Sequence, residues 1–66
     1  MSIRKVYVPV LFEETGEHIV DGEEQETLPD AENFATAMIA EFVEETDKSC
    51  YAKIEIRLVQ DKSRRH

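Results

Sequence analysis

The stretch that decides the fold is Thr27 to Thr46, TLPDAENFATAMIAEFVEET. Its apolar side chains recur with the period of a helix and fall within one half of a helical wheel. These are Ala31, Phe34, Ala35, Met38, Ile39, Phe42 and Val43. Thr27 is suited to be the N-cap, and Pro29 and Asp30 are suited to the first turn. The sequence therefore predicts one amphipathic helix over about residues 28–46.

The segments on either side of this helix alternate in the manner of β-strands. Before the helix, one face carries Val6, Val8, Val10 and Phe12, and the other carries Lys5, Tyr7, Pro9 and Leu11. After the helix, Cys50, Ala52, Ile54, Ile56 and Leu58 form an apolar face, and Tyr51, Lys53, Glu55, Arg57 and Val59 form the other. Between the turn signals at 13–16 and 21–22, residues 17–20 predict a short returning strand.

These elements predict an α+β fold, a β-β-α-β two-layer sandwich in which one helix covers a three-stranded antiparallel sheet. The first strand is apolar on both faces, which favours the middle position and the order 2-1-3. Pro9 argues against a middle position because proline has no N–H to donate to a neighbour. The alternative order 1-2-3 requires a right-handed crossover between parallel strands.

The length of 66 residues predicts a single domain over 1–66, with 62–66 as a basic tail. A chain this short has little core, so self-association is an expected source of stability. The lone Cys50 excludes an intrachain disulfide and favours a reducing, cytoplasmic location. The apolar segment 3–12 is too short to span a bilayer and does not resemble a signal peptide, so no membrane association is expected.

The net charge of −7 is unevenly distributed. Between Val6 and Asp47 there are thirteen acidic residues and no lysine or arginine. This balance argues against direct binding of nucleic acid by the body of the protein. A rival hypothesis places a nucleic-acid or acidic partner at the opposite pole, where five basic residues gather. These are Arg4, Lys5, Lys62, Arg64 and Arg65.

Acidic residues at the end of the predicted helix are unfavourable for stability. Glu41 and Glu45 are four residues apart and repel, and the negative end of the helix dipole repels the acids of the last turn. An unfavourable arrangement without visible compensation suggests a function. The candidate partner-binding surface consists of Glu13, Glu14, Glu17, Glu41, Glu44, Glu45 and Asp47. We expect it to bind a basic surface of another protein.

A second candidate surface is the sheet face that the helix leaves uncovered. We expect Tyr7, Leu11, Tyr51 and Val59 to lie on that face and to form a homodimer interface.

The remaining residues indicate neither catalysis nor metal binding. The serines and the two histidines form no catalytic constellation, and Cys50 lies on an apolar face. Glu17, His18 and Asp21 are three possible ligands close in sequence, and the carboxylate-rich loop 21–26 that follows does not match the calcium-loop spacing. We therefore expect no catalytic residue, no metal and no cofactor. The sequence favours a small non-enzymatic acidic interaction module, an inhibitor or nucleic-acid mimic. The alternative is a small structural homo-oligomer whose acidity only maintains solubility.

Overall fold

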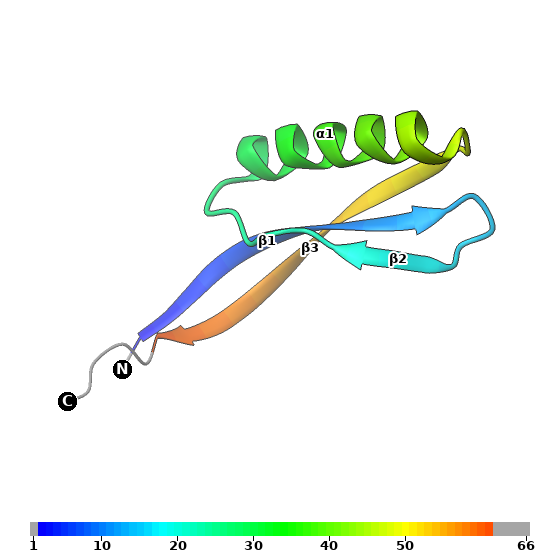
Figure 1. The fold of residues 1–66 in the computed structure, drawn as a ribbon. Coiled ribbons are helices and arrows are strands. Elements are labelled where there is room, and N and C mark those ends of the chain that lie inside the picture. Colours follow the sequence, from blue (N-terminus) through cyan, green and yellow to red (C-terminus); the bar gives the residue numbers. More distant parts are fainter. Residues whose placement is uncertain (1, 62–66) are drawn as a thin grey trace.

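The computed structural model of the chain describes residues 2–61 and contains one helix packed on one antiparallel sheet (Figure 1). The elements in chain order are β1 (Ser2–Glu13), β2 (His18–Asp21), α1 (Leu28–Thr46) and β3 (Cys50–Asp61). The strand order is β2-β1-β3, and both pairings are antiparallel. The predicted α+β class, the β-β-α-β order and the sheet order 2-1-3 are therefore confirmed. The returning strand begins and ends one residue later than the sequence predicted.

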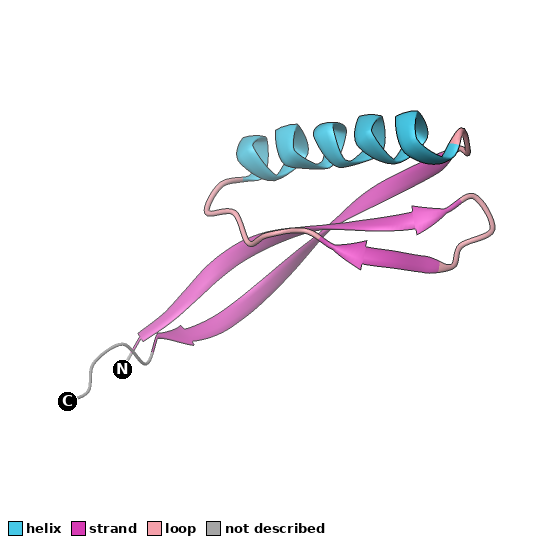
Figure 2. Cartoon of the chain, viewed as in Figure 1, coloured by secondary structure: helices cyan, strands magenta, loops and turns pink. Residues whose placement is uncertain are grey.

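The helix begins and ends where its sequence dictates (Figure 2). The Thr27 hydroxyl oxygen accepts a hydrogen bond of 3.3 Å from the backbone N–H of Asp30, as expected of an N-cap. At the other end, Asp47 adopts the left-handed conformation with a φ of 63°, and its N–H donates to the carbonyl of Val43. This left-handed residue terminates the helix and turns the chain into β3.

Pro9 is accommodated in the central strand because β2 ends beside it. The backbone carbonyl of Pro9 accepts a hydrogen bond from Gly22, the first residue after β2. Two residues away along β1, Tyr7 exchanges two backbone hydrogen bonds with Gln25. The chain between Gly22 and Gln25 leaves the regular ladder, so the N–H that proline lacks falls where no regular partner exists.

The register of β1 against β3 decides which side chains share a face. Leu11 pairs with Ala52, Pro9 with Ile54 and Tyr7 with Ile56, and paired residues point to the same side of a sheet. Leu11 also lines a groove with helix residues, so this is the face that α1 covers. The core on this side consists of Pro9, Leu11, Ala31 and Ala35, which are buried.

The strands extend beyond the helix as a two-stranded arm, at the left of Figure 1. A strand of twelve residues spans about 40 Å, whereas a helix of nineteen spans about 28 Å. On the helix face of the arm, Ile3, Ile56 and Leu58 are between 63% and 69% exposed. The arm therefore presents apolar side chains that the helix is too short to cover.

Gly22 is required by the close approach of the helix to the sheet. A Cβ atom at this position would lie 2.7 Å from Met38 Sδ, 2.9 Å from Pro9 Cγ and 3.2 Å from Phe34 Cε1. We predict that Gly22→Ala lowers the free energy of unfolding by about 1–3 kcal/mol, because the added methyl group overpacks this contact. Urea denaturation measures the loss. Thr15→Ala in the exposed hairpin turn is the control and should change it by less than about 0.5 kcal/mol. Equal effects of the two substitutions would contradict the packing argument.

Candidate functional site

The acidic residues of the helix end border a groove between α1 and β2. The groove has a volume of about 170 Å³, an apolar floor and two carboxylates. Its lining residues are Leu11, Ile19, Val20, Met38, Glu41, Phe42 and Glu45. The β2 side contains a β-bulge, because Leu11 pairs with Val20 and Phe12 with His18, which leaves Ile19 as the extra residue. This volume is below that of typical small-molecule pockets, so the groove is suited to one or two side chains of a partner.

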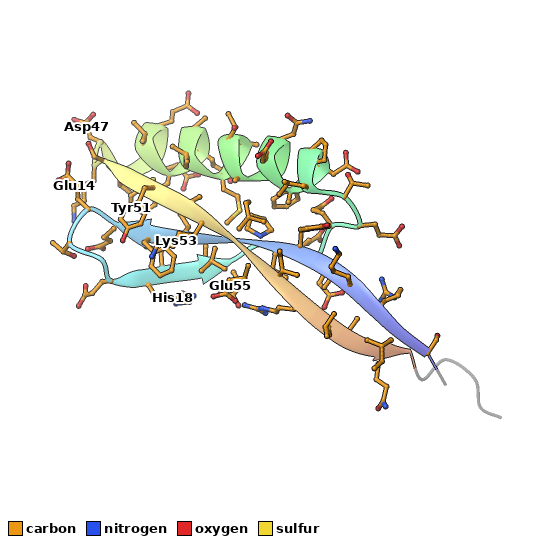
Figure 3. The ribbon with its side chains drawn as sticks, turned by 180° about the vertical axis from the view of Figure 1, so that it is seen from behind. Glu14, His18, Asp47, Tyr51, Lys53 and Glu55 are labelled. Carbon is orange, nitrogen blue, oxygen red and sulfur yellow. The ribbon has the colours of Figure 1, made fainter. Side chains whose placement is uncertain are left out.

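The tip of the β1–β2 hairpin and the loop after the helix meet at the same end of the molecule. A second hollow there is lined by Glu13, Glu14, Thr15, Lys48 and Ser49. Figure 3 shows Glu14 and Asp47 at this same end. The structure thus brings most of the predicted partner-binding surface to one end, which we call the acidic end. Glu17 and Glu44 are exposed but line neither of these two hollows.

The acidic end carries unfavourable features, and Lys48, which lines the second hollow, forms none of the ion pairs found among residues 2–61. The last turn of α1 contains no basic residue. The ion pairs found among residues 2–61 involve Glu26, Asp21 and Glu55, and none involves an acid of the acidic end. Asp47 additionally holds a left-handed conformation that glycine adopts more easily. Stability alone would favour other residues at these positions.

The predicted dimer face is not a single surface. Tyr7 and Leu11 lie on the helix face, whereas Tyr51 pairs with Phe12 and Val59 with Arg4 on the opposite, open face. The sequence-based assignment of these four residues to one face is therefore wrong. The physical reason is the register: it aligns the odd-numbered residues of β1 with the even-numbered residues of β3, so odd positions of the two strands never share a face.

The open face is covered by side chains of the strands themselves rather than by a helix. Val6, Val8 and Val10 are at most 2% exposed although α1 covers the opposite face. Phe12 and Val59 pack against this stripe. The ring of Tyr51 stacks on the ring of Phe12 at a centroid distance of 5.4 Å, and Lys53 Nζ lies 5.5 Å from the same ring centre. Figure 3 shows Tyr51, Lys53, Glu55 and His18 on this side of the sheet.

A polar bridge crosses the central strand above the valines. Arg57 Nη2 on β3 donates a hydrogen bond of 3.1 Å to Asp21 Oδ2 on β2, and one of 2.6 Å to Glu55 Oε1. Arg57 stands opposite Val6, and Asp21 stands opposite Val10, so the bridge passes over Val8. The aliphatic stem of the arginine covers apolar surface while its guanidinium remains in water.

The bridge alters the acidity of its members. Hydrogen bonds from His18, whose Nε2 lies 2.7 Å from Asp21 Oδ1, and from Arg57 hold the pKa of Asp21 below its ordinary value. Hydrogen bonds to Glu55 and Asp21 raise the pKa of Arg57. Sequence reasoning did not identify this bridge. The alternation Glu55–Arg57 on one strand face was a visible signal, but the contact with Asp21 depends on the fold.

The other candidate positions in residues 2–61 are the possible metal ligands, Cys50 and the basic residue Arg4. Among residues 2–61, no three His, Cys, Asp or Glu side chains converge as metal ligands. Cys50 is half-buried and has a free thiol. Arg4 pairs with Glu26 at 3.7 Å, and Lys62, Arg64 and Arg65 of the rival basic pole lie outside the described residues. The one helix in the described part of the chain is not long and apolar enough to cross a membrane.

The chain was compared with family models, with curated proteins and with solved structures, and it matches none of them.

The cost of Asp47 can be divided into a charge effect and a backbone effect. We predict that Asp47→Gly raises the free energy of unfolding by about 1 kcal/mol, because glycine adopts a positive φ without strain and removes a negative charge from the helix end. Asp47→Asn removes only the charge and should raise it by about 0.5 kcal/mol. Urea denaturation distinguishes the two variants. A gain no larger for glycine than for asparagine would contradict the backbone effect.

The lowered pKa of Asp21 predicts a pH dependence of stability. The carboxylate stabilises the fold above its ordinary pKa of 3.8, and this contribution is lost as the pH falls through the lowered value. The unmodified chain should therefore be more stable than Asp21→Asn near neutral pH, and the difference should shrink as the pH falls below 3.8. Urea denaturation of both proteins at a series of pH values tests this. A difference that stayed constant throughout would contradict a role of the Asp21 charge.

Proposed function

We propose that this chain is a non-enzymatic protein-interaction module whose acidic end binds a basic surface of another protein. The observation that carries the proposal is the groove between α1 and β2, where Glu41 and Glu45 border an apolar floor. Carboxylates beside an apolar floor are complementary to a partner that presents lysine or arginine next to an apolar side chain. Arginines on a nucleic-acid-binding face would fit this groove in the same way. Each has an aliphatic stem that suits the apolar floor and a charged guanidinium that suits the carboxylates.

The surroundings of these acids support a role in binding a partner rather than a role in stabilising the fold. Glu41, Glu44 and Glu45 are exposed, and their carboxylates form none of the ion pairs found within residues 2–61. Repulsion along the helix and from its dipole costs a few tenths of a kcal/mol to about 1 kcal/mol for each such placement. A basic partner would relieve this repulsion, so the stability lost in the free protein would be regained in the complex.

We further propose that the module acts as an inhibitor by occupying the surface with which its partner binds a phosphate backbone. The dense acids of the hairpin tip and the helix end would then stand in for phosphates. A cytoplasmic location belongs to the same proposal and is supported by the lone cysteine. The alternative function is a small structural homo-oligomer in which the acids only maintain solubility.

The test compares three baits in affinity capture from native lysate at low salt, with elution at high salt. The first bait is the unmodified chain. The second carries Glu41→Gln, Glu44→Gln and Glu45→Gln, which removes charges at the acidic end. The third is a matched control that carries Glu23→Gln, Glu24→Gln and Glu32→Gln, which removes the same number of charges elsewhere.

We predict that a basic protein is retained by the first and third baits and that the second bait retains at least about tenfold less of it. The second bait should also be slightly more stable than the unmodified chain, because repulsion at the helix end is removed. Loss of binding would then not be a consequence of unfolding. Equal retention by the second and third baits would overturn the proposal and favour the alternative function. Displacement of the captured protein by nucleic acid would support the inhibitor role.

A further inference from the structure

We propose that the outer edge of β3 binds a second copy of this chain, strand to strand and antiparallel, about a twofold axis at Ile56. The two sheets would then form one continuous six-stranded sheet. This inference does not depend on the acidic end, because the two surfaces share no residue.

The edge of β3 lacks proline, bulges and charges on the helix-covered face, three of the devices by which proteins protect an exposed strand. β3 is twelve residues long, contains no proline and pairs with β1 without a register shift. Within residues 50–60 its charged residues are Lys53, Glu55 and Arg57, which lie on the open face, and its helix face carries Ile54, Ile56 and Leu58. Proteins usually interrupt such edges with proline, bulges or inward-pointing charges. A long, regular and partly apolar edge is therefore suited to pairing with another strand.

The backbone hydrogen-bonding groups of the apolar residues point outward from this edge. Tyr7 exchanges both its backbone bonds with Gln25, on the β2 side of β1. Val6 and Val8, its neighbours along β1, therefore form their backbone hydrogen bonds with β3. Their partners Arg57 and Glu55 direct their own N–H and C=O groups toward β1. Since the direction alternates along a strand, Ile54, Ile56 and Leu58 direct their N–H and C=O groups away from β1, where the sheet of residues 2–61 has no further strand.

Two requirements select the register between β3 and β3 of the second copy: opposite charges should face each other, and exposed apolar side chains should be covered. With the axis at Ile56, Arg57 stands opposite Glu55 of the second copy on the open face, and the reverse pair forms as well. On the helix face, Ile56 meets Ile56 of the second copy, and Leu58 meets Ile54. Moving the axis to Leu58 would place Arg57 opposite Val59 and leave the charges unmatched.

An axis at Ile54 is less favourable for the apolar residues. It would place Leu58 opposite Cys50 and Ile56 opposite Ala52, which are smaller partners. The axis at Ile56 places the most exposed side chains of β3, Ile56 at 63% and Leu58 at 69%, beside branched apolar residues. It also brings the arm of each copy alongside the helix-covered half of the other, because Ile54 pairs with the buried Pro9. Each copy would thus cover the surface that the helix of the other is too short to reach.

The charge pairs are tested by sedimentation equilibrium of variants. Glu55→Arg alone and Arg57→Glu alone place like charges opposite each other and should raise the dissociation constant of the dimer at least about tenfold. An equimolar mixture of the two variants restores both pairs and should form a heterodimer as tightly as the unmodified chain forms its dimer. Lys53→Glu is the matched control on the same face: it stands opposite Val59 and should leave the constant unchanged. Circular dichroism establishes that each variant is folded, and Glu55→Arg retains the Arg57–Asp21 bridge.

Disulfide formation tests the register independently of the charges. In a Cys50→Ser background, Ile56→Cys places two thiols directly opposite each other across the axis, at a distance that a disulfide can span. Mild oxidation should cross-link this variant, whereas Leu58→Cys should remain uncross-linked because its thiols are offset by four residues. Cross-linking of Leu58→Cys alone, or failure of the mixed charge variants to associate, would overturn the proposed register. A monomeric mass of the unmodified chain up to roughly 1 mM would overturn the dimer and leave the edge to a strand of a different protein.

Discussion

The antiparallel pairing of β1 on both of its sides is the constraint on which the rest of this structure depends. In the sheet of residues 2–61, β1 is the strand with two neighbours, and side chains on both its faces are buried. Its register against β3 places Leu11 and Pro9 beneath the helix and Val6, Val8 and Val10 on the open face. A slip of one residue against β3 would exchange these two sets. Because both sets are apolar, the alternation pattern alone does not choose between the two registers.

The open face shows how so small a domain can bury a second apolar layer without a second helix. Valine is short, and in a central strand it lies below the longer side chains of the two flanking strands. Arg57 and Asp21 join across it, and Tyr51 and Lys53 cover Phe12. Exposed ion pairs contribute little by themselves. Their larger effect here is to hold long side chains over apolar atoms, which makes the bridge a means of packing.

The two ends of the molecule differ in chemistry because the helix is shorter than the strands. At one end, the helix terminus, the hairpin tip and the loop after the helix bring acidic residues together around two small hollows. At the other end the arm projects, leaves apolar side chains exposed, and ends the sheet of residues 2–61 with β3 as an edge strand. Neither feature benefits an isolated 66-residue domain, which has little stability in reserve. This is the physical basis for assigning an interaction to each end.

The sequence by itself determined the elements of this protein and their order. The helical period of 28–46, the cap at Thr27 and the alternation of the two long strands depend on local periodicity and on local hydrogen bonds, which neighbouring residues specify. The central position of β1 followed as well, since only a middle strand is apolar on both faces. The gathering of acids was also predictable, because a hairpin tip and a helix end in this topology fall at the same end of the sheet.

Only the tertiary structure decided which faces the residues share. The alternation pattern is the same whichever of two neighbouring registers two strands adopt, so Tyr7 and Leu11 could not be separated from Tyr51 and Val59 before the pairing was known. The position of Pro9 beside the end of β2, the contact of Gly22 with Met38 and the reach of Arg57 to Asp21 likewise depend on residues far apart in the chain. Such contacts are set by the alignment of whole strands, and no local pattern encodes that alignment.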